Sequence, residues 1–168
     1  MFSVVTATYN TKPDVLARTW ASLKAQTYLD WEWIVYDDSP DLDTYHQIYG
    51  FCADERYRIR LYRPHVPSGG NIGYVKRTAF GLAHGDILVE LDHDDQLTPD
   101  ALAEIAVAFN NSDIGFVYSD CAEVYPNGSS LRYPDGWGLG YGEHYWDEAL
   151  QVWACRVPIN RTTLSHIV

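Results

Sequence analysis

Short apolar runs alternate with amphipathic segments along most of the chain. Runs of β-branched residues are typical of buried parallel strands, and apolar residues repeated every three or four positions are typical of helices. The sequence therefore predicts strands at residues 3–8, 31–36, 59–62, 88–91 and 114–118, and helices at residues 13–27, 42–53, 74–84 and 98–110. Alternation of strand and helix predicts an α/β fold, with a mostly parallel central sheet and helices on both faces.

Turn-forming residues separate these elements. Residues 64–73 form a loop rich in proline and glycine, and Gly85 is expected to end the following helix as its C-cap. Asn127 and Gly128 lie between two segments that contain apolar residues, a pattern typical of a β-hairpin turn.

Polar side chains follow three of the predicted strands at the point where each strand ends. They are Thr-Tyr-Asn at residues 8–10, Asp-Asp at residues 37–38 and Asp-His-Asp-Asp at residues 92–95. Ligands of parallel α/β sheets bind beyond the carboxyl ends of the strands. We therefore expect these three strand ends to converge on one ligand site.

The acidic run at residues 92–95 has two interpretations. Carboxylates this close repel one another unless a cation lies between them, and their oxygens suit hard ions such as Mg²⁺ and Mn²⁺. Asp92 and Asp94 would then hold a divalent metal ion that also binds a phosphorylated ligand. His93 would point to the opposite face if the strand geometry continues, and it is therefore not counted as a ligand. The alternative is a solvated acidic turn before the next helix.

Size and net charge narrow the class of protein. The chain has 168 residues, of which 46% are hydrophobic, enough for one domain with one core. Its formal net charge of −11 argues against nucleic acid or an anionic membrane as the main partner. With that charge, a phosphorylated ligand would need a metal ion or a local basic cluster beside it.

Cysteine spacing and the absence of long apolar runs bear on the compartment. Cys52, Cys121 and Cys155 are widely spaced and form no CxxC pair, so buried, reduced thiols are expected rather than a disulfide framework or a zinc site. The sequence contains no leader-like segment at its start and no apolar run long enough to span a membrane. The expectation is a cytoplasmic protein.

Several of these segments together resemble a known family, the family-two glycosyltransferases of the GT-A fold. The resemblance extends from about Phe2 to Asp120 and is carried by residues 4–10, 26–27, 32–39, 70–73, 76–77, 85–87, 92–95 and 98–100. It implies a Rossmann-like GT-A (nucleotide-diphospho-sugar transferase) fold in one domain, residues 1–168. Residues 1–120 would bind the nucleotide sugar, and residues 121–168 would form an acceptor-side part, with truncation of that part as one interpretation.

The resemblance also implies an activity. The chain would transfer a sugar from a nucleotide-diphosphate sugar to a hydroxyl of a glycan, a lipid-linked sugar or a similar acceptor, with inversion and with Mn²⁺ or Mg²⁺ as cofactor. The expected donor is a UDP-sugar, with GDP- and dTDP-sugars as alternatives. The alternative function is a truncated module that binds the nucleotide sugar without catalysis.

Positions in the family motifs assign roles to individual residues. Asp38 would accept a hydrogen bond from the base, Arg77 or Lys76 would face the diphosphate, and Asp92 and Asp94 would bind the metal ion. The full set implied to contact the nucleotide sugar is Thr8, Tyr9, Asp38, Asn71, Gly73, Lys76, Arg77 and Asp92.

The catalytic base is the least defined of the implied residues. Family members usually carry a Glu-Asp pair well after the metal motif, whereas the comparable pair here is Asp147-Glu148, in the reverse order and in a different context. Asp95 is a further candidate, and the base could also lie beyond Val168.

Two other enzyme classes share the α/β plan. A nucleotidyltransferase would need a glycine-rich loop that cradles phosphates directly after the first strand, and a Rossmann dehydrogenase would need GxGxxG there. Residues 9–12, Tyr-Asn-Thr-Lys, match neither pattern.

Overall fold

The protein is described from a computed structural model, which defines residues 1–53, 57–133, 142–156 and 158–159, without the side chains of residues 43, 44, 47, 51 and 52. The chain divides into two compact units, Met1–Ser112 and Asp113–Val168. The expected functional division near residue 120 stays a prediction.

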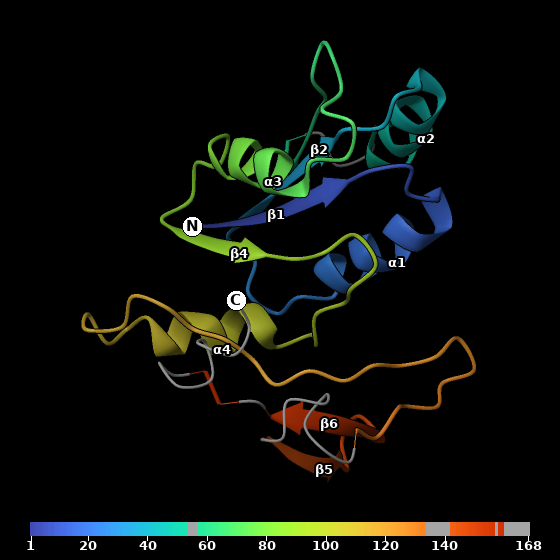
Figure 1. Cartoon of the computed structure of the whole chain (residues 1–168). Coiled ribbons are helices and arrows are strands. Elements are labelled where there is room, and N and C mark those ends of the chain that lie inside the picture. Colours follow the sequence, from blue (N-terminus) through green and yellow to red (C-terminus); the bar gives the residue numbers. More distant parts are fainter. Residues whose placement is uncertain (54–56, 134–141, 157, 160–168) are drawn as a thin grey trace. The chain divides into compact units, whose positions relative to one another are not determined.

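The first unit is built on a parallel sheet (Figure 1). Its strands are β1 (Phe2–Thr8), β2 (Trp31–Asp37), β3 (Ile59–Tyr62) and β4 (Ile87–Glu90), in the order β3-β2-β1-β4. Along the chain, β2 and then β3 are added on one side of β1, and β4 is added on the other side of β1. This reversal creates a switch point at the carboxyl ends of β1 and β4, where α/β sheets bind their ligands.

Helices cover both faces of this sheet, as predicted. They are α1 (Pro13–Lys24), α2 (Leu42–Cys52), α3 (Ile72–Phe80) and α4 (Ala101–Ala108). Side chains alternate between the two faces of a strand. Val4 therefore packs into the core formed with α1, α2 and α4, whereas Val5 packs against α3.

The core on the α1 side is held by two tryptophans. Trp33 is fully buried, and its ring stacks on that of Trp20 with centroids 5.4 Å apart. Its indole nitrogen donates a hydrogen bond of 2.9 Å to Thr6 Oγ1, so burial leaves this polar group satisfied. Buried Gln26 then joins α1 to the start of α4, because its side chain donates to Thr98 O and accepts from Leu102 N.

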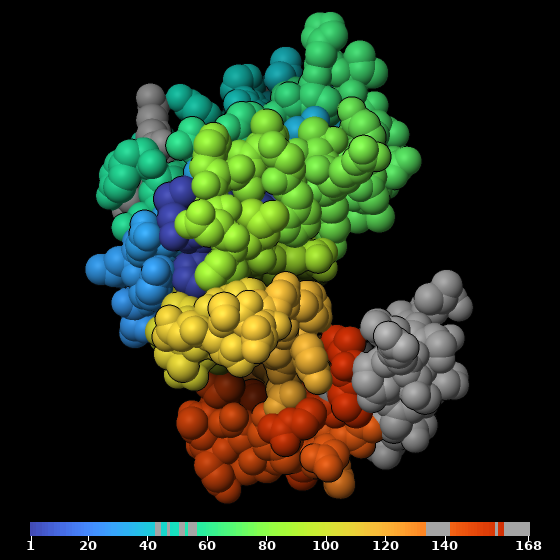
Figure 2. All heavy atoms as spheres, turned by 90° about the vertical axis from the view of Figure 1, so that its left-hand side faces the viewer, coloured from blue at the N-terminus to red at the C-terminus, as the bar shows by residue number. Residues whose placement is uncertain are grey.

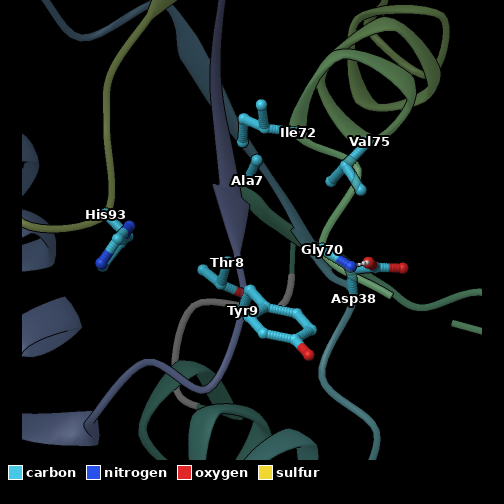
Figure 3. A pocket seen from close by; sticks show the side chains of 8 residues that line it. All are labelled: Ala7, Thr8, Tyr9, Asp38, Gly70, Ile72, Val75 and His93. Carbon is cyan, nitrogen blue, oxygen red and sulfur yellow. Dashed lines mark hydrogen bonds between the residues drawn. The ribbon is translucent and has the colours of Figure 1, made fainter. Parts of the chain in front are cut away.

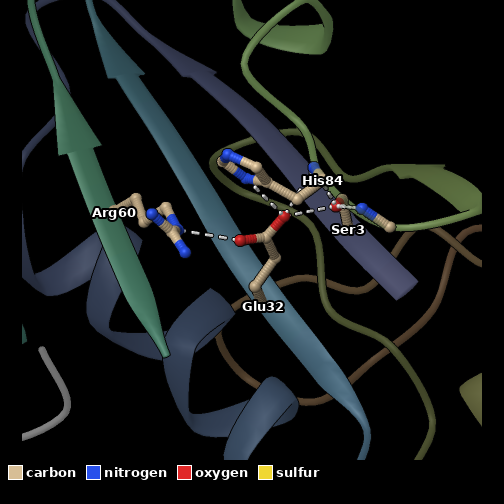
Figure 4. Close-up of polar contacts among 5 residues, drawn as sticks. Ser3, Glu32, Arg60 and His84 are labelled. Atoms are coloured by element: carbon tan, nitrogen blue, oxygen red, sulfur yellow. Dashed lines mark hydrogen bonds and ion pairs between the residues drawn. The ribbon is translucent and has the colours of Figure 1, made fainter. Parts of the chain in front are cut away.

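A buried carboxylate organises the amino end of the sheet (Figure 4). Glu32 accepts hydrogen bonds from Ser3 Oγ (2.6 Å), His84 N (2.8 Å) and Arg60 Nε (2.9 Å). Burial raises the pKa of Glu32, but these hydrogen bonds outweigh it, and the net result is a lowered pKa. The carboxylate joins β1, β2, β3 and the segment before β4.

The expectation that Gly85 caps the third helix is wrong. Helix α3 ends at Phe80 with Gly81 as its C-cap, and the amides of His84 and Gly85 donate to Glu32 and Ser3 rather than to helix carbonyls. A Cβ atom on Gly85 would lie 2.6 Å from Ser3 N. In Figure 2, light-green atoms lie directly against dark-blue atoms from the start of the chain.

The second unit contains a β-hairpin, β5 (Glu143–Asp147) and β6 (Val152–Arg156). The strand predicted at residues 114–118 is wrong: this described segment has no ladder partner, and Phe116 is 71% exposed. Backbone pairing starts only at Cys121, opposite Cys155. Cys121 is exposed, contrary to the expectation of a buried thiol, and Cys155 is buried. The predicted turn at Asn127-Gly128 is confirmed, since Gly128 N donates to Tyr125 O and Gly128 has a φ of 83°.

Within the described part of the chain, no helix is both long enough and apolar enough to cross a lipid bilayer.

Candidate functional site

A pocket of about 80 Å³ lies at the carboxyl ends of β1 and β2 in the first unit (Figure 3). Five segments contribute to it: the end of β1, the residue after β2, the loop before α3, the start of α3, and the turn after β4. Its lining residues are Ala7, Thr8, Tyr9, Asp38, Gly70, Ile72, Val75 and His93. Three residues predicted from the strand ends, Thr8, Tyr9 and Asp38, therefore come together as expected.

Asp38 holds the loop that forms one wall of this pocket. Its carboxylate is fully buried and accepts from Ser68 N (2.7 Å), Ser68 Oγ (2.7 Å) and Gly70 N (3.1 Å). An ionised carboxylate can accept about four hydrogen bonds, so capacity for about one more donor remains. The predicted bond to a nucleotide base would have to use that capacity or displace the loop.

The neighbouring Asp37 closes the turn beside the pocket. Its Oδ1 accepts from Thr8 Oγ1 (3.0 Å) and Ser39 Oγ (2.5 Å), and Ser39 Oγ in turn accepts from Asn10 N. Asn10 has a φ of 52°, a left-handed conformation that asparagine tolerates better than most residues. Of the two adjacent aspartates, Asp37 shapes the ends of β1 and β2, and Asp38 faces the pocket.

Gly70 lets the loop lie against the Tyr9 ring. Its φ is 84°, and a Cβ atom at this position would lie 3.6 Å from Tyr9 Cζ. Tyr9 stays 44% exposed, so part of its ring is available to a ligand. Asn71, predicted to contact the nucleotide, caps α3 by accepting from Tyr74 N at 3.1 Å, and Gly73 lies in the first turn of α3, outside the pocket lining.

The turn after β4 differs from the prediction at His93. Strand β4 ends at Glu90, and Asp95 N donates to Asp92 O, so the side chains of residues 92–95 do not alternate as in a strand. The expectation that His93 points away from the site is therefore wrong. Its side chain lines the pocket from the side opposite α3, and its carbonyl accepts from Thr19 Oγ1 at 2.7 Å (Figure 3). The prediction failed because it continued the strand beyond Glu90, where pairing with β1 ends.

Lys76 contacts the acidic run directly. Its ammonium nitrogen lies 2.8 Å from Asp92 Oδ1 and 2.5 Å from Glu90 Oε1. Burial lowers the pKa of Lys76, but hydrogen bonds to these two carboxylates outweigh it and raise the pKa above its usual value. Arg77 is exposed and, among the described residues, takes part in no ion pair. Of the two adjacent basic residues, Lys76 is therefore the one that contacts the carboxyl end of β4.

The other two acidic residues of the run remain open to solvent. The Asp94 side chain is 62% exposed and lies 4.0 Å from His93 Nδ1. Partial desolvation raises the pKa of Asp95, and the charges of Asp94 and Asp92 raise it further. Over the part of the chain that is described, no three His, Cys, Asp or Glu side chains gather closely enough to hold a metal ion by themselves.

The two acidic residues predicted as catalytic from the family pattern belong to the second unit. Asp147 Oδ1 accepts from Ala149 N and Leu150 N, both at 2.9 Å, and so closes the turn after β5. Glu148 Oε2 accepts from Gln151 Nε2 in the same turn.

A parallel sheet in this order, with helices on both faces and a pocket at the carboxyl ends of its strands, defines an α/β fold. The sequence matches the family "Glycosyl transferase family 2" over residues 3–164. The chain belongs to this family, and the resemblance drawn from its motifs is confirmed.

Curated relatives include proteins named for polysaccharide biosynthesis. The chain is 31% identical to the O-antigen biosynthesis protein RfbC of Myxococcus xanthus, over 71% of this chain and 9% of RfbC. It is 35% identical to the succinoglycan biosynthesis protein ExoW of Rhizobium meliloti, over 60% of this chain and 31% of ExoW. The uncharacterized protein y4gI of Sinorhizobium fredii is 30% identical over 86% of this chain and 16% of y4gI. The chain thus spans less than a third of the length of these relatives.

Solved structures agree on the fold. The crystal structure of S. aureus TarS 1–349 in complex with UDP matches with a TM-score of 0.59 and 22% identity, over 80% of this chain and 39% of that chain. The same part of TarS in complex with UDP-GlcNAc gives a TM-score of 0.59 as well. These similarities confirm the predicted GT-A architecture.

Proposed function

We propose that this chain binds a nucleotide-diphosphate sugar and transfers its sugar, with inversion, to a hydroxyl group of a carbohydrate acceptor. The observation that carries the proposal is the position of the pocket: it lies at the sheet's switch point, directly beside the acidic turn after β4. Family membership supports sugar transfer, and the names of RfbC and ExoW support a polysaccharide as product.

The nucleotide would occupy the pocket beside Tyr9. The half-exposed Tyr9 ring offers a stacking surface to a base, and Asp38 at the pocket wall can accept one more hydrogen bond. UDP is the first donor to test, because TarS was solved with UDP and UDP-GlcNAc; GDP- and dTDP-sugars are the alternatives.

A divalent cation, Mn²⁺ or Mg²⁺, would be held by Asp92 and Asp94. These two residues fit such an ion, because both lie on one turn, both offer carboxylate oxygens, and both side chains are at least half exposed. Mg²⁺ is commonly bound by one or two carboxylates plus substrate phosphates. When bound, the ion would neutralise negative charge on the leaving diphosphate. Lys76, already at this turn, would add a second positive charge there.

Transfer with inversion is a single displacement. The acceptor oxygen bonds to the anomeric carbon from the face opposite the departing diphosphate, whose oxygen keeps the bonding electron pair. A carboxylate removes the proton from the acceptor hydroxyl. Asp95 is one candidate for this base, because its raised pKa makes it a stronger base than an ordinary aspartate. Asp147 and Glu148 of the second unit are the others.

A second function, nucleotide-sugar binding without turnover, is favoured by one observation. Asp147, the candidate closest to the family's catalytic pattern, uses Oδ1 to accept from two backbone amides of its own turn. A residue in that role contributes to the turn whether or not any chemistry occurs.

Titration calorimetry followed by a donor-turnover assay tests both functions. The protein is titrated with UDP, GDP and dTDP with and without Mn²⁺, and release of the nucleoside diphosphate from the matching sugar donor is then measured. Metal-dependent binding with turnover supports the enzyme, and binding alone supports the binding module. Asp94→Ala should abolish the Mn²⁺-dependent part of binding, whereas Asp14→Ala, an equal charge change at an exposed position of α1, should not. Undiminished Mn²⁺-dependent binding in the Asp94 variant would refute the metal assignment.

A further inference from the structure

Two buried threonines hold the backbone of the acidic turn after β4 at neighbouring points. Thr6 Oγ1 in β1 donates a hydrogen bond of 2.8 Å to Leu91 O, and Thr19 Oγ1 in α1 donates one of 2.7 Å to His93 O. Both threonines are fully buried. The two accepting carbonyls belong to the peptide groups that directly precede the two residues proposed to bind the metal ion.

A hydrogen bond to such a carbonyl orients the residue that follows it. The peptide group is planar, so fixing the carbonyl of one residue also fixes the amide and the Cα atom of the next. Thr6 therefore orients the backbone at Asp92, and Thr19 orients the backbone at Asp94. Asp95 N donates to Asp92 O at 3.1 Å and closes the turn. The Asp92 and Asp94 side chains are 50% and 62% exposed, but the backbone that carries them is held from inside the fold.

Helix α1 carries Thr19 in a row of buried polar residues. Ser22 lies three positions later on the same face of α1, and Gln26 follows just beyond the end of the helix. Ser22 Oγ accepts from Leu97 N at 3.2 Å, and the Gln26 side chain donates to Thr98 O at 2.7 Å. The row thus binds successive points of the segment between β4 and α4, and Thr19 is its member at the acidic turn.

We propose that Thr19 is a positioning residue for the metal site, because its hydrogen bond to His93 O holds Asp94 where it can bind the ion together with Asp92. The inference rests on the proposed function, since it takes these two aspartates as the metal ligands. Groups that orient metal ligands contribute strongly to affinity, and their loss commonly lowers it about 10- to 100-fold.

Thr19 allows a cleaner test than Thr6. Thr6 Oγ1 also accepts from Trp33 Nε1 at 2.9 Å, so its removal would leave a buried indole nitrogen without this acceptor. Thr19→Val keeps the branched shape of the side chain and removes the hydroxyl donor. The peptide group before Asp94 is then no longer held in advance, and binding of the ion has to order it.

Two measurements on the full chain test the proposal. Without metal or nucleotide, hydrogen exchange at Asp95 N should be faster in Thr19→Val, because the turn loses a restraint. With UDP at a fixed concentration, the Mn²⁺ concentration that gives half-maximal UDP binding should rise about tenfold or more in this variant. Maximal UDP binding at high Mn²⁺ should stay unchanged, whereas a variant that had only lost stability would lose maximal binding.

Three further variants serve as controls. Thr19→Ser keeps the hydroxyl and should retain the original Mn²⁺ midpoint. Ser22→Ala removes a buried hydroxyl from the same face of α1, so it should lower the free energy of unfolding without moving the Mn²⁺ midpoint. If Thr19→Val does not fold, Thr19→Cys replaces it, because a thiol is a weaker donor than a hydroxyl, and a smaller shift in the same direction is expected.

The possible failures can be told apart. An unchanged Mn²⁺ midpoint in the Thr19→Val or Thr19→Cys protein, or an equal shift in Ser22→Ala, would overturn this proposal and leave the proposed function intact. Faster exchange at Asp95 N without a shifted midpoint would also overturn it, because Thr19 would then order the turn without serving the metal site. If the unmodified protein shows no Mn²⁺-dependent UDP binding, the metal assignment fails and this proposal fails with it.

Discussion

The ammonium nitrogen of Lys76 lies 2.8 Å from Asp92 Oδ1, at the point where β4 leaves the sheet. The same nitrogen also contacts Glu90, so one cation offsets two carboxylates in a chain whose net charge is −11. An anionic diphosphate would otherwise meet a purely negative surface there. The protein thus carries its own positive charge at the proposed donor site.

This contact predicts unequal roles for two adjacent basic residues. Lys76→Met should weaken binding of a UDP-sugar by about 10- to 100-fold, because a hydrogen bond to a charged group contributes about 1.5–3 kcal/mol. Arg77→Met removes the same charge from the next position of α3, where the side chain is exposed, and should change affinity less than threefold. Calorimetry at fixed Mn²⁺ measures both. Equal losses in the two variants, or unchanged binding by the Lys76 variant, would assign the diphosphate contact elsewhere.

Much of the first unit could be predicted because its strands are short runs rich in apolar and β-branched residues, and three of them are followed by polar residues. The seven residues of β1 are all buried, and those of β2 as well, so their sequences are typical of parallel strands covered on both faces. The polar ends, Thr8 and Asp38 among them, then fall at the pocket because all four strands run in the same direction.

The failures arise where contacts distant in sequence decide the local structure. Gly85 follows a helical pattern, but the helix ends at Phe80 and the His84 amide beyond it donates to Glu32, a residue 52 positions earlier in the chain. His93 lines the pocket because strand pairing stops at Glu90, and pairing depends on β1 rather than on the local residues. Residues 114–118 have strand-like composition but pair with no strand among the residues that the structure describes.

Glu32 predicts how stability depends on pH. Its pKa in the folded state is lowered from about 4.5, so its contribution is fully present above that value and is lost as the pH falls through the folded-state pKa. Glu32→Gln should cost about 1–3 kcal/mol at pH 7, because the buried donors around it lose a charged acceptor. Urea unfolding between pH 3 and pH 7 should show the two proteins converging in stability below about pH 4.5. A stability difference that stays constant over this range would contradict the role given to Glu32.

The close contact between Gly85 and Ser3 predicts that a side chain at position 85 would destabilise the fold through packing, and not through loss of a helix cap. Gly85→Ala places a methyl group 2.6 Å from the backbone nitrogen of Ser3, and we expect destabilisation of at least about 1–3 kcal/mol from overpacking. Gly50→Ala is the matched control, because its Cβ meets nothing within 4 Å and alanine favours a helix such as α2 by about 0.5–1 kcal/mol. Chemical denaturation of the two variants should give shifts of opposite sign.

Asp38 predicts a link between loop order and donor binding. Asp38→Asn keeps the shape of the side chain but replaces one acceptor oxygen with a donor amide. Because Ser68 N and Gly70 N donate to different oxygens of Asp38, at least one of these two amides loses its acceptor in either orientation of the asparagine side chain. Hydrogen exchange at the amides of these two residues should accelerate, and UDP binding should weaken by about tenfold or more, the effect of losing one hydrogen bond to a charged group. Asp37→Asn is the control: it perturbs the turn with Ser39 and Thr8 but leaves the loop bonds intact, so it should lower stability without accelerating loop exchange. If both variants accelerate exchange equally, the hydrogen bonds to Asp38 do not order the loop more than those to Asp37 do. If exchange accelerates in the Asp38 variant while UDP affinity stays unchanged, the loop is not part of the donor site.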